Sequence, residues 1–169
     1  MSFKQPEPVQ VVKERRDAAL HALVSRIPFT TFLGVQIERK GDELTSVLPF
    51  DEKLIGNPEL PALHGGATAG FLEVTAIIQL CWSVMWEDME NSGCVPQTEQ
   101  PGFQIRVPKT IDFTVDYLRS GLPRDAYARA RVNRSGRRYA SVHVEGWQDN
   151  QTRPFAQATG HFLMPPRDG

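Results

Sequence analysis

The sequence has little of what marks metal, redox or secreted proteins. Its 169 residues include only two cysteines, Cys81 and Cys94, and no metal-ligand or redox spacing joins them. His21, His143 and His161 likewise have no ligand spacing with one another or with an acid, so we expect structural roles for them. We therefore expect no metal and no other cofactor.

An excess of charge of either sign is also missing. Nineteen Lys and Arg face twenty Asp and Glu, which leaves a formal net charge of -1 at pH 7. Such a balance gives no general attraction to nucleic acid or to an anionic membrane, and no basic helix-turn-helix segment is present. We expect neither as a partner.

Long hydrophobic runs are absent as well. The most apolar stretch, residues 65–86, is interrupted by the acidic Glu73 and by polar side chains at Thr68, Thr75 and Gln79. It falls short of the roughly eighteen consecutive apolar residues typical of a membrane span. The first sixteen residues lack the apolar core and cleavage site of a secretory signal. We therefore expect a cytoplasmic protein.

Length and composition favour one domain. Hydrophobic residues make up 40% of the chain and charged residues 23%, close to the averages of globular proteins. A chain of this size can bury about two thirds of its unfolded surface. Since no repeat or low-complexity tract divides it, we expect a single domain over residues 1–169, with an N-terminal helical region at 1–28 and the core at 29–165.

The first half of the chain predicts two helices separated by a hairpin. Apolar residues among charges predict an amphipathic helix over 9–27, ended by Pro28. Alternation at 33–37, a turn at 40–42 and an apolar segment at 44–50 predict the hairpin. Residues 65–86 are apolar on every side, which is typical of a buried helix. The polar residues 87–102 predict a loop.

The second half predicts antiparallel strands. Apolar and polar residues alternate over 111–117, 126–132, 140–144 and 156–162, and polar turns at 133–138 and 148–153 join the last three segments. No β-α-β alternation calls for a parallel sheet. The chain is therefore predicted to have an α+β fold, in which one antiparallel sheet wraps the apolar helix.

Residues 63–73, LHGGATAGFLE, contain the strongest candidate site. His64, Gly65 and Gly66 lie where a loop enters the predicted buried helix, whose first amides have no partner inside the helix. These amides and the helix dipole suit a developing oxyanion, and glycine lets a ligand approach the backbone. Gly65 is the candidate oxyanion donor, with Gly66 beside it. Alternatively, the glycines serve only a tight helix entry.

Glu73 is the only charged side chain in the predicted buried helix. Carboxylates are rarely buried unless they are paired or functional. Glu73 is therefore a candidate base or nucleophile. The alternative is a salt bridge to an arginine of a neighbouring strand or subunit.

Three features together resemble one protein family over residues 32–164. They are HGG followed by an acid nine residues after the His, the segment TIDFTVDYLR at 110–119, and the turn RSGRR at 134–138. The combination resembles the PaaI-type branch of the hotdog thioesterases. The resemblance implies a hotdog fold, an antiparallel sheet wrapped around a long central helix. It also implies dimers paired edge to edge, further assembly into dimers of dimers or homotetramers, and a site between two subunits.

The resemblance also implies an activity, the hydrolysis of an acyl-CoA thioester to a free acid and CoA. By position, Gly65 corresponds to the amide that holds the thioester oxygen, and Glu73 to the base or nucleophile. His64 would shape the helix entry, and Asn57 corresponds to a residue that positions water or the carbonyl. A thiol leaves without a dedicated general acid, so one base or nucleophile and an oxyanion hole can suffice.

Arginines are concentrated between residues 124 and 138. Arg134, Arg137 and Arg138 flank Gly136 in the predicted turn, where guanidinium groups could hold CoA phosphates in bidentate contacts. For the strand arginines an exposed sheet face is the simpler explanation. Aromatic and sulfur-containing residues of the buried helix could line an acyl tunnel, but core packing explains them better; these are Phe71, Trp82, Met85 and Trp86.

Two other functions stay open at this stage. A hotdog dehydratase or hydratase also acts on acyl thioesters, but the His motif of the acyl-carrier-protein dehydratases is absent. A non-catalytic acyl-CoA-binding module is the other alternative, although such regulators usually carry a DNA-binding domain.

Overall fold

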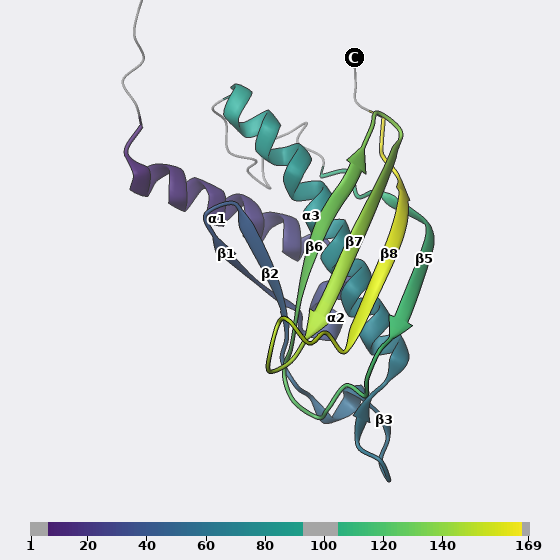
Figure 1. Ribbon diagram of the computed structural model, residues 1–169. Helices are drawn as coiled ribbons and strands as arrows, with labels where there is room; N and C mark the ends of the chain where they lie inside the picture. Colours follow the sequence, from purple (N-terminus) through teal and green to yellow (C-terminus); the bar gives the residue numbers. More distant parts are fainter. Residues whose placement is uncertain (1–6, 93–104, 167–169) are drawn as a thin grey trace, which may run out of the picture.

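The computed structural model describes residues 7–92 and 105–166, with only the backbone of 87–92. Cys94 and residues 93–102 of the predicted loop lie outside these ranges. The described chain contains one large antiparallel sheet with the strand order β1-β2-β6-β7-β8-β5 (Figure 1). Its strands are β1 (Gln36–Lys40), β2 (Glu43–Leu48), β5 (Lys109–Tyr117), β6 (Ala126–Ser135), β7 (Tyr139–Trp147) and β8 (Ala156–Leu163).

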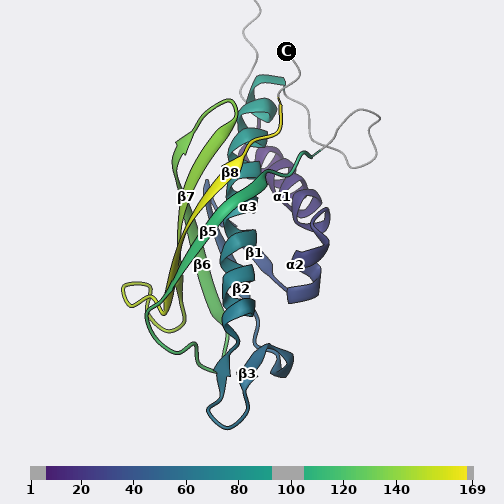
Figure 2. The same cartoon turned by 90° about the vertical axis from the view of Figure 1, so that its right-hand side faces the viewer.

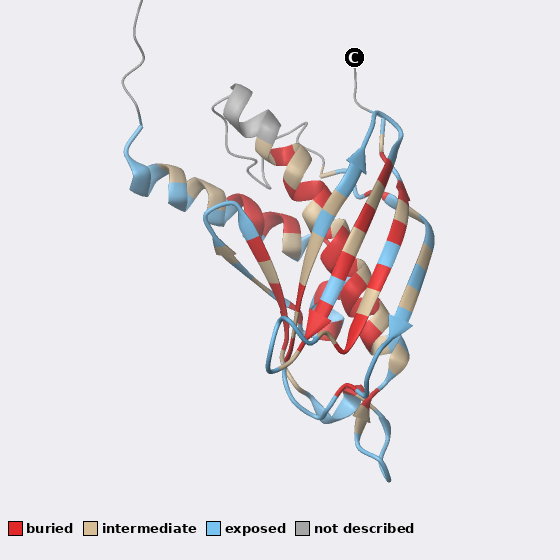
Figure 3. Cartoon of the chain, in the orientation of Figure 1, coloured by how far each residue is buried: buried red, intermediate tan, exposed pale blue. Residues whose placement is uncertain are grey.

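The central helix α3 (Gly65–Ser92) packs against the concave face of this sheet (Figures 1 and 2). Small side chains on the facing strands let the helix approach closely, and Figure 3 shows the buried stripes that result. Fully buried alanines on the sheet are Ala126, Ala128, Ala140, Ala156 and Ala158. The predicted sheet around a central helix is therefore confirmed.

A second core lies on the other side of α3. The helix α1 (Val9–Ser25) contributes Leu20 and Leu23, which pack with Ile78 and Trp82 of α3. Figure 2 shows the sheet, α3 and α1 as successive layers. The large apolar residues of α3 named above are at least partly buried in these two cores, as predicted. They hold the helix in place.

By length and composition, α3 could cross a membrane, and no other described helix could. However, 67% of its most apolar window is buried against the rest of the molecule. Its apolarity is therefore that of a core helix, as the interruptions in its sequence predict.

Several element boundaries differ from the prediction. Pro28 begins a further short helix, α2 (Pro28–Leu33), which ends at Gly34 in the left-handed conformation with φ 76°. The helix α3 continues to Ser92, through the start of the predicted loop. The strand β6 passes a bulge after Val132 and continues to Ser135, so the predicted turn at 133–138 is shorter.

Candidate active site

A small ladder fixes the chain before it enters α3. The strands β3 (Ile55–Asn57) and β4 (Ala62–Leu63) pair with each other. The Leu63 amide donates to the Gly121 carbonyl at 2.8 Å, and the His64 amide donates to the Leu54 carbonyl at 2.7 Å. The first turn of α3 therefore begins from a backbone that is held on two sides.

His64 caps the start of α3. Its Nδ1 accepts a hydrogen bond from the Gly66 amide at 2.9 Å, and its carbonyl accepts one from the Thr68 amide at 3.0 Å. Because Nδ1 accepts, the ring proton lies on Nε2. A Cβ at Gly56 would lie 2.9 Å from His64 Cα, so glycine is needed there for this close approach. These contacts agree with the implied role of His64 at the helix entry.

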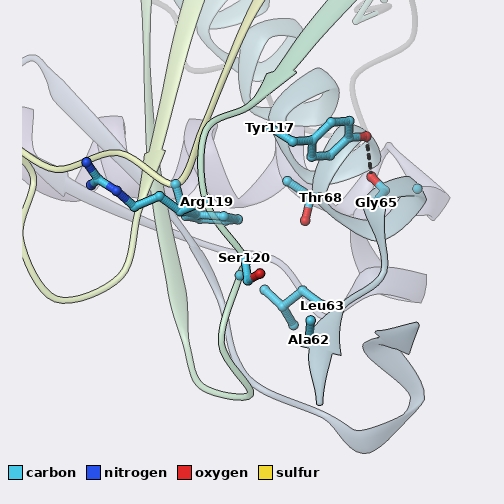
Figure 4. Close-up of a pocket in the computed structure, with 10 residues that line it drawn as sticks. Ala62, Leu63, Gly65, Thr68, Tyr117, Arg119 and Ser120 are labelled. Carbon is cyan, nitrogen blue, oxygen red and sulfur yellow. Dashed lines mark hydrogen bonds between the residues drawn. The ribbon is translucent and has the colours of Figure 1, made fainter. Parts of the chain in front are cut away.

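Gly65 is the first residue of α3, and within the described ranges its amide donates no hydrogen bond. Its carbonyl accepts a hydrogen bond from the Tyr117 hydroxyl at 2.8 Å, which Figure 4 shows. An open cavity of about 560 Å³ lies at this point. Its lining residues are Ala62, Leu63, Gly65, Gly66, Thr68, Tyr117, Arg119, Ser120, Gly121 and Phe155. The geometry thus presents a helix N-terminus with a free donor to a cavity.

Glu73 is partly exposed rather than fully buried, which corrects the expectation of a buried acid. Its Oε1 accepts a hydrogen bond from Thr110 Oγ1 at 2.6 Å. No arginine pairs with it among the described residues, so the salt-bridge alternative finds no support within the chain. A neutral donor therefore orients the carboxylate through Oε1, and the second oxygen, Oε2, can act as a base or nucleophile.

Asn57 does not reach the cavity. Its Oδ1 accepts hydrogen bonds from the Glu59 amide at 3.0 Å and the Leu60 amide at 3.4 Å. This is the turn between β3 and β4, where asparagine commonly hydrogen-bonds the backbone that follows it. In the single chain Asn57 therefore closes a turn, and the structure does not bring it together with Gly65.

The candidate phosphate-binding arginines lie at the opposite end of the sheet from Gly65. Arg134 is in β6, paired with Ser141, rather than in the turn where it was predicted. The β6–β7 hairpin lies at the Lys109 end of β5, because Tyr139 pairs with Leu163, which pairs with Lys109. A strand of nine residues spans roughly 26 Å. Arg137, Arg138 and Gly136 therefore do not meet Gly65 within one chain.

Other predicted features have structural partners. Arg129, one of the arginines in the strands, pairs with Glu43 at 2.7 Å and donates to Thr45, so it links β6 to β2. His161 Nδ1 lies 2.9 Å from both carboxylate oxygens of Asp112 on the neighbouring strand. The sequence spacing does not reveal this pair, because the pairing of β5 with β8 creates it.

Comparisons with known proteins agree with this architecture. A family model described as "Thioesterase superfamily" matches residues 60–155, more than half of the chain. The medium/long-chain acyl-CoA thioesterase YigI of Escherichia coli K12 is 29% identical over 145 residues, which cover 83% of this chain and 88% of that protein. The same protein of Salmonella typhimurium is 28% identical with the same coverage.

Solved structures have the same fold. A Chromobacterium violaceum protein is 31% identical, covers 93% of this chain and 98% of its own, and has a TM-score of 0.61. A Shewanella oneidensis protein related to the thioesterase superfamily is 26% identical, with coverages of 94% and 99% and a TM-score of 0.65. A Bacillus halodurans protein solved with CoA is 18% identical, with coverages of 98% and 100% and a TM-score of 0.59.

The chain therefore belongs to the thioesterase superfamily and has the hotdog fold. The resemblance found in the sequence is confirmed at this level. Sequence reasoning did not single out Thr110 and Tyr117, the two side chains that contact Glu73 and Gly65. Both lie in the segment 110–119 that carries the resemblance, and this was the available signal.

Proposed function

We propose that this chain is an acyl-CoA thioesterase, which hydrolyses an acyl-CoA to a free acid and CoA. The observation that carries the proposal is Gly65 at the start of α3, which lines a cavity and whose amide has no partner among the described residues. A fixed N–H donor at a helix N-terminus stabilises the negative charge that develops on a thioester oxygen. The apolar side chains of Leu63 and Phe155 offer contacts for an acyl group in the same cavity.

Besides the oxyanion donor, hydrolysis of the thioester needs a base or a nucleophile. Thiols are acidic leaving groups, with a pKa of about 8.5 for cysteine, so the thiol of CoA leaves as a thiolate without a general acid. Glu73, oriented by Thr110, supplies the base or nucleophile. In one route its second oxygen removes a proton from water, the water oxygen bonds to the carbonyl carbon, and the C–S bond breaks. In the other route it attacks the carbonyl carbon itself, the thiolate leaves from the resulting acyl-Glu73 anhydride, and water then hydrolyses that anhydride and restores the carboxylate. Each route ends with a free acid and a thiolate.

The Gly65 and Glu73 of one chain are too far apart to act on one carbonyl. Eight residues of α3 separate them, and a rise of 1.5 Å per residue gives about 12 Å along the helix axis. Reacting groups must lie within about 3 Å of the carbonyl. We therefore propose a homodimer in which Gly65 of one subunit and Glu73 of the other complete each site.

The strand β5 is the edge that suits such a dimer. It ends the sheet, and exposed apolar side chains lie on it or beside it, namely Val107, Ile111, Tyr117 and Leu118. An exposed sheet edge is a template for pairing with a strand of another chain, and exposed apolar patches mark interaction sites. Two β5 strands paired about a two-fold axis run antiparallel, so the Lys109 end of one subunit meets the Tyr117 end of the other.

This pairing gives the hairpin arginines a role across subunits. It brings the β6–β7 hairpin of one subunit toward the end of the sheet where the other subunit has Gly65. Arg134, Arg137 and Arg138 are therefore still proposed to contact CoA phosphates, together with the backbone at Gly136. The CoA in the Bacillus halodurans structure and the name of the Escherichia coli relative support an acyl-CoA as the substrate class.

The test is thiol release from a panel running from acetyl-CoA to palmitoyl-CoA. We expect the native chain to release thiol. We expect Glu73→Gln to fold normally and to lose roughly two to four powers of ten in kcat, the usual range for a positioned base. Glu59→Gln, in the exposed β3–β4 turn, is the matched control and should keep full activity.

Three results would reject the proposal. They are the absence of thiol release on every substrate, Glu73→Gln activity within about threefold of the native chain, and addition of water to an enoyl-CoA without thiol release. The last result would identify a hydratase.

A further inference from the structure

We propose that Tyr117 is a positioning residue, whose hydroxyl fixes the helix entry so that the Gly65 amide alone remains free to hold the thioester oxygen. The inference rests on the proposed function and assigns a role to a side chain outside the glycine motif. Tyr117 is the last residue of β5 and is 55% exposed, so packing alone does not explain its position.

Two consecutive peptide groups meet at Gly65, and three of their four polar groups are occupied. In the first peptide, the His64 carbonyl accepts from the Thr68 amide. In the second, the Gly65 carbonyl accepts from the Tyr117 hydroxyl at 2.8 Å, and the Gly66 amide donates to His64 Nδ1 at 2.9 Å. The fourth group is the Gly65 N–H. Within the described residues it has no partner.

These hydrogen bonds restrain the two peptide groups, which is important because Gly65 and Gly66 follow one another. Glycine has more backbone freedom than any other residue, so a Gly-Gly entry can rotate its peptide planes away from a productive direction. An oxyanion donor is effective only when its direction is set before the charge develops. The Tyr117 hydroxyl holds the carbonyl end of the Gly65–Gly66 peptide, while His64 holds its N–H end. Tyr117 is the only one of the three contacts that comes from outside the helix entry itself.

The ring of Tyr117 also lies against Gly65. A Cβ built at Gly65 would be 3.3 Å from the Tyr117 oxygen and 3.4 Å from Cζ. The ring and the hydroxyl can therefore be separated experimentally, because Tyr117→Phe keeps the ring and removes only the hydrogen bond. Tyr127→Phe is a matched control, since Tyr127 lies near the start of β6, away from the hairpin proposed to bind CoA, and its ring stacks on Trp147.

The experiment compares both variants with the native chain in kcat, KM and inhibitor binding. One inhibitor is a trifluoromethyl ketone analogue of the acyl-CoA, whose hydrate resembles the oxyanion; the other is an S-alkyl-CoA thioether, which lacks the carbonyl. For Tyr117→Phe we expect kcat to fall about three- to tenfold, the effect of losing one hydrogen bond, with KM unchanged. The ketone should bind more weakly by a similar factor and the thioether equally well. Tyr127→Phe should change none of these values.

A purely structural role predicts a different result. In that case Tyr117→Phe would lower the melting temperature or weaken both inhibitors equally, and either finding would overturn the proposal. Unchanged kcat and ketone binding would overturn it as well. These failures are distinct from failure of the proposed function. If the native chain hydrolyses acyl-CoA and Glu73→Gln does not, while Tyr117→Phe behaves as the native chain, only the positioning role is lost.

Discussion

Thr110 links the edge strand β5 to the acid of the central helix. Its hydroxyl donates to Glu73 Oε1 at 2.6 Å, so the carboxylate has a defined direction. Hydrogen bonds to charged groups are worth more than neutral ones. In a catalytic carboxylate, the same contact restrains the geometry in which its free oxygen meets water or the carbonyl.

We expect Thr110→Val to lower kcat roughly tenfold, because the isosteric side chain removes the donor to Glu73 and leaves the packing in place. Steady-state thiol release measures the effect. Thr114→Val is the matched control on the same strand, where Thr114 is exposed. If Thr110→Val and Thr114→Val have the same kcat, the hydrogen bond to Glu73 does not contribute to catalysis.

The buried environment of Cys81 makes the stability of the chain depend on pH. Burial raises the pKa of its thiol from 9.0 to about 12. The unfolded thiol loses its proton from about pH 9 upward, while the folded one keeps its proton to about pH 12. This group therefore lowers the free energy of unfolding as pH rises through that window.

The same shift should make the thiol unreactive in the folded chain. In a Cys94→Ala variant, only Cys81 remains to be alkylated. At pH 8 we expect iodoacetamide to react about a thousandfold more slowly with the folded than with the denatured chain, since the thiolate is the nucleophile. From pH 8 to 9 the folded rate should rise about tenfold. Equal rates in the two states would contradict the burial of Cys81.

Gly160 in β8 lies against two aromatic rings of the core, Phe113 of β5 and Phe162 of β8 itself. A Cβ at Gly160 would lie 2.7 Å from side-chain atoms of both Phe113 and Phe162. These rings meet edge to face with centroids 6.5 Å apart, and Phe162 is fully buried. The close contact of β8 with this pair therefore requires glycine at position 160.

We predict that Gly160→Ala lowers the free energy of unfolding by about 1–3 kcal/mol, the usual cost of overpacking a core. Thermal or urea denaturation measures it. Thr159→Ala, at the exposed neighbouring position, is the control and should change stability by less than about 0.5 kcal/mol. If the Gly160→Ala chain is as stable as the control, the two rings can move to accept the methyl group without loss of stability.

Most elements of this fold follow from the periodicity of the sequence, and the boundaries that differ from the prediction have local causes. The four alternating segments and the apolar helix are correct because their patterns extend over many residues. Pro28 predicts the end of the preceding helix, but proline also suits the first position of a helix, and α2 begins there. The bulge after Val132 interrupts the alternation of β6, so the sequence pattern stops before the strand does.

Some residues of the candidate site can be recognised in the sequence, and others depend on the three-dimensional packing. Gly65 and Glu73 could be found in the sequence because one helix entry and one acid stand out in an apolar segment. Thr110 could not be assigned to Glu73, because that contact depends on how the helix packs across the sheet. Asn57 precedes a proline, a common turn signal, and its side chain is used in that turn.

On the scale of the whole molecule, the decisive question is whether two chains complete one site. The separation of about 12 Å between Gly65 and Glu73 along α3 requires this if both act on one carbonyl. The requirement can be tested by complementation. Gly65→Pro removes the proposed donor, and proline is well tolerated at the first position of a helix. Glu73→Gln removes the acid, so each variant alone should be inactive.

Coexpression of the two variants should restore activity. In a mixed dimer, one site combines the intact Gly65 of one chain with the intact Glu73 of the other, and the second site carries both changes. With random pairing, half of the dimers are mixed and each has one working site, so we expect about a quarter of the native activity. Light scattering must show a dimer or a larger assembly in the same sample. A site contained within one chain would give no recovery, because neither variant then holds both groups, and a monomer would exclude sharing altogether.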